Sequence, residues 1–221
     1  MNLFDILGPV MVGPSSSHTA GAVRIGLIAR RLLGEGTPSK AKITLFGSFA
    51  ATGKGHGTDR ALIAGLLGMN PDDERIGVSF DWAKGAGMEF SFIRSKLAEN
   101  HPNTAKVDLV SKSGKTFSVV ASSLGGGRIV VTEMNGVKVQ FSGELSTMII
   151  QNVDKPGRVG EVSTVLADYQ VNIAAMQLYR NYRGGNAVMI IETDRDVPSE
   201  AIDALSAVQG IMSVIAINKE R

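Results

Sequence analysis

The stretch Gly13-Pro14-Ser15-Ser16-Ser17-His18-Thr19 is followed at once by a helical pattern. Apolar residues then recur at intervals of three and four, at Ala22, Ile25, Ala29 and Leu32, which predicts one apolar helix face. A helix that starts here presents free backbone N–H groups and the positive end of its dipole to the serines. Such helix ends bind phosphate and carboxylate groups. One serine is enough to cap a helix, so the stretch is either an over-built cap or part of an anion-binding site.

A second polar loop is predicted between a buried strand, Ala41 to Phe46, and a helix that begins near Thr58. It contains Gly53-Lys54-Gly55-His56-Gly57-Thr58-Asp59, in which alternate glycines let a ligand approach the backbone. Lys54 offers a charge for an anion, and His56 offers a base whose ordinary pKa is near neutral. Asp59 would orient this imidazole or, like Thr58, cap the helix.

The alternative for this loop is a flexible glycine turn that ends in a helix cap. A Walker A loop is excluded, because Gly55 follows Lys54 where that motif requires Ser or Thr. The third histidine lies in His101-Pro102-Asn103-Thr104, which could equally form a simple turn. All three histidines of the chain therefore lie in loops of small polar residues, where a titratable group near neutral pH can act on a ligand.

Two different sheets are expected beyond residue 104. Four short strands with a period of two predict an antiparallel meander: Val107 to Val110, Phe117 to Ala121, Ile129 to Thr132 and Val137 to Phe141. Asn135-Gly136 is a strong signal for a two-residue hairpin turn. The remaining segments alternate in the order βαββαβ: Thr147 to Asn152, Pro156 to Asp168, Asn172 to Tyr179, Ala187 to Thr193, Pro198 to Val208 and Ile211 to Ile217. This order is typical of a ferredoxin-like fold, so the fold class predicted for the whole chain is α+β.

A change in charge supports a boundary between two domains. Sixteen basic and eleven acidic residues precede Glu144, whereas seven basic and ten acidic residues occur from Glu144 onward. We therefore expect domains at 1–142 and 146–221. At the start of the second domain, Asp154 would cap a helix with Pro156 near its first position. Asp154, Gly157 and Arg158 are its candidate effector-binding residues.

Composition limits the classes of function. The chain has 221 residues, a hydrophobic content of 43% and a net charge of only +2, which gives no general argument for binding nucleic acid or a membrane surface. Residues 1 to 12 do not resemble a targeting peptide, so a cytoplasmic protein is expected. The sequence has no cysteine, so this chain cannot supply thiolates to zinc or to an iron–sulfur cluster. No metal site built from this chain alone is predicted.

Together, the serine stretch, the Gly-Lys-Gly-His-x-Thr-Asp loop and His-Pro-Asn-Thr-Ala resemble the β subunit of bacterial iron–sulfur L-serine dehydratase. In this resemblance residues 1 to about 142 correspond to the β-type domain, which is similar to the allosteric substrate-binding domain of some phosphoglycerate dehydrogenases. Residues from about 146 to 221 resemble an ACT domain, on the basis of the strand order and the Asp-x-Pro-Gly pattern. The resemblance implies an L-serine ammonia-lyase, a carbon–nitrogen lyase of amino-acid catabolism and gluconeogenesis.

The resemblance implies that two different chains contribute to the reaction. An α subunit would hold a [4Fe–4S] cluster on cysteines, with one iron open to serine as a Lewis acid that helps hydroxide to leave. His56 matches the position of the base that takes the α-proton. The substrate or a neighbouring anion would be bound by a larger set: Ser15, Ser16, Ser17, His18, Thr19, Lys54, Thr58, Asp59, Asn103 and Thr104. Self-association through the ACT domain is also expected.

Two other functions are compatible with parts of the sequence. A non-catalytic regulatory module would combine an anion-sensing domain with an amino-acid-sensing ACT domain, but a sensor has no need for His56. An independent Ser/His hydrolase is disfavoured, because the sequence lacks a Gly-x-Ser-x-Gly elbow.

Overall fold

The computed structural model describes residues 10–218 except 54, 97–100 and 181, and the chain divides into two compact units, Met1–Gly136 and Val137–Arg221. The division falls at the predicted Asn135-Gly136 turn, where both residues have positive φ, as the tightest hairpin turns require. The domain boundary expected between residues 142 and 146 lies a few residues later and stays a prediction.

The first unit is built on a mixed sheet. Its strands are β1 (Lys40–Leu45), β2 (Glu89–Arg94), β3 (Thr104–Val110), β4 (Thr116–Gly125) and β5 (Arg128–Met134). They are hydrogen bonded in the order β2-β1-β3-β4-β5. β1 and β2 run parallel, whereas β3 to β5 are the first three strands of the predicted antiparallel meander. Buried and exposed residues alternate along β1, with Ala41, Ile43 and Leu45 on the buried face.

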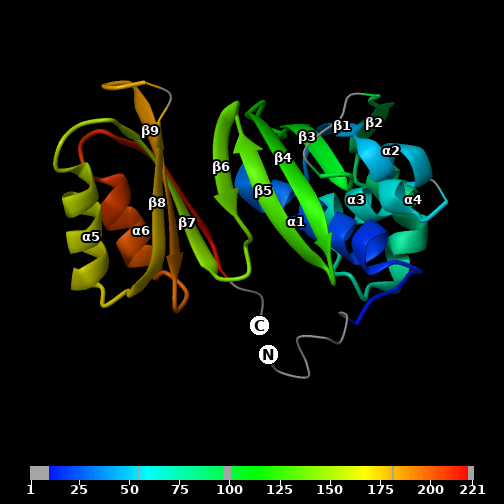
Figure 1. The fold of residues 1–221 in the computed structure, drawn as a ribbon, viewed down its shortest axis with the longest axis horizontal. Helices are drawn as coiled ribbons and strands as arrows, with labels where there is room; N and C mark the ends of the chain where they lie inside the picture. The colour runs from blue at the N-terminus through cyan, green and yellow to red at the C-terminus, as the bar shows by residue number, and fades with distance from the viewer. Residues whose placement is uncertain (1–9, 54, 97–100, 181, 219–221) are drawn as a thin grey trace. The chain divides into compact units, whose positions relative to one another are not determined.

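Helices cover this sheet and position the polar motifs (Figure 1). They are a π-helical turn (Ser16–Ala20), α1 (Gly21–Leu33), α2 (Gly47–Thr52), α3 (Thr58–Leu67), a 3-10 turn (Glu74–Val78) and α4 (Ser79–Gly85). α1 packs against β4 and α3. A Cβ on Gly26 of α1 would stand 2.9 Å from the Cα of Gly65 in α3, so the two backbones meet without intervening side chains. α1 ends at Gly34 in the left-handed conformation, which glycine adopts at many helix ends.

Two local predictions in this unit were wrong. Residues 47 to 52 were expected to belong to a loop, but they form the short helix α2. The helix after the glycine loop was expected to be capped by Thr58 or Asp59. Its N-cap is Gly57 in the left-handed conformation, with no side-chain cap. Phe90 to Leu97, whose sequence fits either a strand or a helix, contains most of β2, a strand at the edge of the first unit's sheet.

The second unit begins with β6 (Val137–Phe141) and continues in the predicted βαββαβ order. Its elements are β7 (Ser146–Val153), α5 (Arg158–Asp168), β8 (Ile173–Arg180), β9 (Asn186–Thr193), α6 (Ser199–Ser206) and β10 (Ile211–Ile217). The sheet order β10-β7-β9-β8, with every adjacent pair antiparallel, is that of a ferredoxin-like fold. The α+β class expected from the sequence is thus confirmed.

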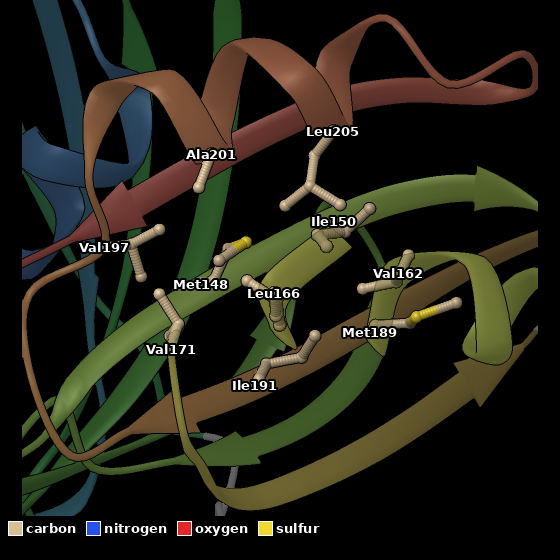
Figure 2. Packing of buried hydrophobic residues seen from close by; sticks show 10 residues of the cluster. All are labelled: Met148, Ile150, Val162, Leu166, Val171, Met189, Ile191, Val197, Ala201 and Leu205. Atoms are coloured by element: carbon tan, nitrogen blue, oxygen red, sulfur yellow. The ribbon is translucent and has the colours of Figure 1, made fainter. Parts of the chain in front are cut away.

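α5 and α6 lie on the same face of this sheet (Figure 1). Figure 2 shows Val162 and Leu166 of α5, and Ala201 and Leu205 of α6, clustered with methionine and isoleucine side chains of β7 and β9. These residues are at most 4% exposed, so the unit has a hydrophobic core of its own. Among the described residues, no helix is both long and apolar enough to cross a membrane.

Candidate functional site

The serine stretch forms the beginning of a helix rather than a loop in front of one. Ser15 is the N-cap, and its Oγ accepts a hydrogen bond from the His18 backbone N–H at 3.1 Å. Residues Ser16–Ala20 follow as a π-helical turn that continues directly into α1, and the Gly21 N–H donates to the Ser16 carbonyl. A single wide turn of this kind at a helix end is common at functional sites. It brings His18 onto the first turn of the helix.

Both ring nitrogens of His18 have hydroxyl partners. Nε2 lies 3.2 Å from Ser48 Oγ and 3.2 Å from Thr52 Oγ1 of α2, while Nδ1 lies 3.4 Å from Ser15 Oγ. The Thr52 hydroxyl donates its proton to the Ser48 carbonyl, so it accepts from His18, which places the His18 proton on Nε2. Burial, and then the charge of His56, lower the pKa of His18. His18 is therefore neutral near pH 7 and joins the serine turn to α2.

His56 lies beside His18, with 5.0 Å between the ring centroids. Its Nδ1 is 3.3 Å from the Thr52 carbonyl oxygen. Because a carbonyl can only accept, the neutral imidazole carries its proton on Nδ1 and a lone pair on Nε2. No described residue hydrogen bonds to this Nε2. The exposed His56 side chain thus has the tautomer and the free nitrogen that a general base needs.

The rest of the glycine loop differs in part from its expected arrangement. Asp59 was expected to orient His56 or cap α3, but its carboxylate accepts the Arg60 backbone N–H at 2.9 Å. The Thr52 carbonyl has the orienting role instead. Thr58 is fully buried, and its Oγ1 has no hydrogen-bond partner. Thr19 reaches the loop from the serine turn, with its Oγ1 3.5 Å from the His56 carbonyl. Lys54, the expected anion ligand, lies outside the described residues.

The third motif contacts the same region through the start of α2. The Pro102 carbonyl accepts the Ser48 backbone N–H at 2.7 Å, and Ser48 in turn contacts His18. His101 holds the motif together: its Nδ1 accepts the Asn103 N–H, and its carbonyl accepts the Thr104 hydroxyl. Asn103 Oδ1 is buried without a partner. The structure therefore brings all three sequence motifs to one site, although His101 acts on it through the backbone.

The glycine-rich hairpin between β4 and β5 also belongs to this region. The Gly126 N–H donates to Ser16 Oγ at 3.3 Å, and Arg24 donates to the Gly127 carbonyl at 3.0 Å. The hairpin is thus hydrogen bonded to both the serine turn and α1. In the sequence, Gly125-Gly126-Gly127 indicates only a hairpin connection.

Three further residues of the site were missed at the sequence level. Ser48 and Thr52 bind His18, and Phe49, fully buried, packs its ring edge-on against His18 at 5.3 Å between centroids. Their signal is the i, i+4 spacing of Ser48 and Thr52, which puts both hydroxyls on one face of a helix. This spacing indicates a shared helix face only if residues 47 to 52 are helical, which the sequence did not predict.

The candidate effector residues of the second unit form a separate group. α5 begins at Arg158 with Gly157 as N-cap, so the prediction that Asp154 caps this helix was wrong. The Asp154 carboxylate accepts instead from the Gly184 N–H at 3.0 Å and from Arg180 at 3.2 Å. The Gly184 N–H and then the Arg180 guanidinium lower the pKa of Asp154. Arg158 is 9% exposed and ion-paired with Glu161.

The donor set of this chain does not fit a metal cluster. The described residues contain no group of three or more His, Cys, Asp or Glu side chains that could hold a metal ion, and the sequence has no cysteine. A [4Fe–4S] cluster would need ligands from another chain.

The fold and site define a two-unit protein: a mixed α/β unit that carries a pair of histidines, followed by a unit with a ferredoxin-like fold. Comparison with known families identifies residues 2–83 as serine dehydratase beta chain and residues 146–210 as an ACT domain. The chain belongs to the family of L-serine dehydratase beta chains.

Individual relatives agree with this assignment. A probable L-serine dehydratase beta chain of Bacillus subtilis is 41% identical over 98% of this chain and 97% of its own. The L-serine dehydratase beta chain of Peptoniphilus asaccharolyticus is 38% identical over 93% of each chain. A D-3-phosphoglycerate dehydrogenase of Methanocaldococcus jannaschii is 36% identical over 56% of this chain and 23% of its own. The last match agrees with the expected likeness to phosphoglycerate dehydrogenases.

Proposed function

We propose that this chain is the catalytic β chain of a heteromeric L-serine dehydratase, which converts L-serine to pyruvate and ammonia together with an alpha chain. The observation that carries the proposal is the His56 imidazole, whose Nδ1 is fixed by the Thr52 carbonyl and whose Nε2 has no hydrogen-bond partner among the described residues. The names of the two long relatives, both beta chains, support the existence of an alpha partner. The [4Fe–4S] cluster implied by the resemblance would be held by that partner, since this chain has no cysteine.

The reaction begins with loss of the α-proton of serine. His56 Nε2 accepts this proton, and the imidazolium that forms keeps its Nδ1–H bond to the Thr52 carbonyl. His18, 5.0 Å away, stays neutral because its pKa is lowered, so it does not repel the new charge. The β-hydroxyl then leaves as hydroxide, which together with the proton on His56 amounts to one water. The resulting aminoacrylate tautomerises to an imine, which hydrolyses to pyruvate and ammonia without further help from the protein.

The serine turn binds the substrate carboxylate or a neighbouring anion in this proposal. Ser16, Ser17 and the free N–H groups at the start of the helix supply donors, and the helix dipole favours negative charge there. Lys54, Thr58, Asp59, Asn103 and Thr104 complete the proposed binding set, as expected from the resemblance. In the second unit, Asp154, Gly157 and Arg158 are proposed to bind an effector.

The experiment that tests the catalytic assignment is steady-state kinetics of His56→Ala. The variant is mixed anaerobically with the cognate alpha chain, and pyruvate is assayed. We expect kcat to fall by roughly 10²–10⁴, because this is the usual value of a positioned general base. The control is His56→Gln, which keeps hydrogen-bonding capacity without basicity and should lose as much. A loss of less than about tenfold in both variants would contradict the role of His56 as the base.

A further inference from the structure

Thr52, the last residue of α2, is hydrogen bonded to the rings of both histidines through two different groups. Its Oγ1 lies 3.2 Å from His18 Nε2, and its carbonyl oxygen lies 3.3 Å from His56 Nδ1. The two rings come from different segments of the chain, the serine turn and the glycine loop. Thr52 therefore connects the serine turn to the proposed base.

The side-chain hydroxyl of Thr52 has a fixed orientation. It donates its proton to the Ser48 carbonyl, four residues earlier in the helix, at 3.0 Å. Helical threonines often make this bond, and it restricts the rotation of their side chain. Because its proton is used in this way, the Thr52 oxygen accepts from His18. The same His18 nitrogen also lies 3.2 Å from Ser48 Oγ, so two hydroxyls on one helix hold the ring.

The backbone carbonyl of Thr52 is the other half of the connection. It accepts the backbone N–H groups of Gly55 and His56 at 3.0 Å and 3.3 Å, so the glycine loop turns at the C-terminal end of α2. The His56 ring adds a third contact to this oxygen. Carbonyl groups at the C-terminal end of a helix carry partial negative charge, which favours the imidazolium that forms when His56 takes up a proton. A free imidazole exchanges between two tautomers, and this contact selects the one with its lone pair on Nε2.

We propose that Thr52 is a positioning residue for the reaction, whose hydroxyl ties His18 and the serine turn to the carbonyl that sets the tautomer and direction of His56. This inference rests on the proposed function, and it makes His18 an anchor rather than a second base. An anion that binds the serine turn then also holds the base in place, through His18 and Thr52. Without the hydroxyl, the carbonyl is still present, but it is no longer fixed to the turn that binds the anion.

The first test compares Thr52→Val with Thr52→Ser in anaerobic pyruvate assays with the cognate alpha chain. Valine keeps the shape of threonine without the hydroxyl, whereas serine keeps the hydroxyl without the methyl group. We expect Thr52→Val to lower kcat at least about tenfold, a part of the 10²–10⁴ that a positioned base supplies, with KM within about threefold of the parent. Thr52→Ser should keep kcat within about threefold. Thr52 is exposed, so neither variant disturbs the core.

The second test uses the full chain without its partner. Long-range proton–nitrogen NMR correlations of the imidazole rings report the tautomer of each histidine at about pH 8, where an ordinary imidazole is neutral. In the parent we expect opposite tautomers, with the proton on Nε2 of His18 and on Nδ1 of His56. In Thr52→Val, His56 should show a mixture of both tautomers, and in Thr52→Ser it should resemble the parent.

The matched control is Thr164→Val in α5 of the second unit, which changes another exposed threonine on a helix. It should leave kcat and both tautomers as in the parent. The proposal is overturned if Thr52→Val keeps either the parent's kcat or its His56 tautomer, if Thr52→Ser loses as much kcat as Thr52→Val, or if Thr164→Val has the same effects. A tautomer change in Thr52→Val, in a chain whose parent forms no pyruvate with the alpha chain, would support the connection between the histidines and refute the proposed reaction.

Discussion

The two histidines of the site differ in how their ring nitrogens are bound. His18 has hydroxyl partners on both nitrogens and a ring contact to buried Phe49, whereas His56 is held only at Nδ1, by a backbone carbonyl. A histidine whose two ring nitrogens are both hydrogen bonded holds its neighbours in place. A histidine with one free ring nitrogen can take up and release a proton. The sequence alone presents the two in similar polar loops. Their unequal roles depend on Ser48 and Thr52. The sequence does not predict the helix that brings these two hydroxyls to His18.

The lowered pKa of His18 predicts that the protein loses stability in mild acid. The unfolded chain binds a proton at His18 near pH 6.5, while the folded site binds it only at lower pH. Between these two pKa values the unfolded state holds more protons than the folded state. The free energy of unfolding therefore falls as the pH decreases through this window. At pH values above the window His18 is neutral in both states and costs no stability. Denaturant unfolding of the parent and of His18→Asn between pH 5 and pH 8 measures the effect. The variant should show a smaller loss on the acid side, and parallel curves would contradict the prediction.

Among the elements, the close contact of α1 and α3 determines how far apart the histidines are. α1 follows directly from the turn with His18, and α3 begins two residues after His56. A Cβ on Gly65 would collide with the Val23 carbonyl, and one on Gly26 with the Leu62 carbonyl. Because backbone atoms cannot yield as a flexible side chain can, any side chain here pushes the helices apart.

Gly65→Ala is therefore expected to destabilise the protein by about 1–3 kcal/mol and to lower kcat. The matched control is Gly160→Ala in α5, a helical glycine with no atom within 4 Å of an added Cβ. That change should raise stability by roughly 0.4–1 kcal/mol, because alanine has less conformational freedom to lose. Denaturant unfolding and pyruvate assays of both variants provide the measurement. Equal effects of the two substitutions would refute the close-contact argument.

Predictability from sequence differed between elements for a physical reason. The βαββαβ order and the meander were predicted within a few residues, because their strands and helices bury one face and show a clear period. α2 was missed, because six residues are too short for a period and its only fully buried side chain is Phe49. The π-helical turn was missed because its serines suggest a cap, and one of them, Ser15, is the cap.

For the whole molecule, each unit has its own hydrophobic core. In the second unit Leu166 is fully buried among α5, α6, β7 and β9, as Figure 2 shows. In the first unit Leu62 is fully buried in α3. Separate cores predict that damage to one unit is confined to it.

Leu166→Ala is expected to cost about 2–5 kcal/mol of local stability, the usual cost of a cavity at a fully buried leucine. Hydrogen exchange followed by mass spectrometry should show the loss of protection in residues 146–217 and not in α1 or α3. Leu62→Ala is the reciprocal control, with the loss confined to the first unit. If either variant lowers protection in both units equally, the chain unfolds as a single cooperative body.

The π-helical turn also fixes the spacing between the helix cap and His18. A π turn is one residue inserted into an α-helix, so deleting one serine from the run Ser15 to Ser17 would restore ordinary helical winding. The residue three positions before His18 would then be Pro14 in place of Ser15. The helix would lose the hydroxyl that accepts the His18 backbone N–H and caps its first turn. The length of the serine run is therefore constrained as well as its hydroxyl chemistry, because removing one residue changes the spacing between the cap and His18.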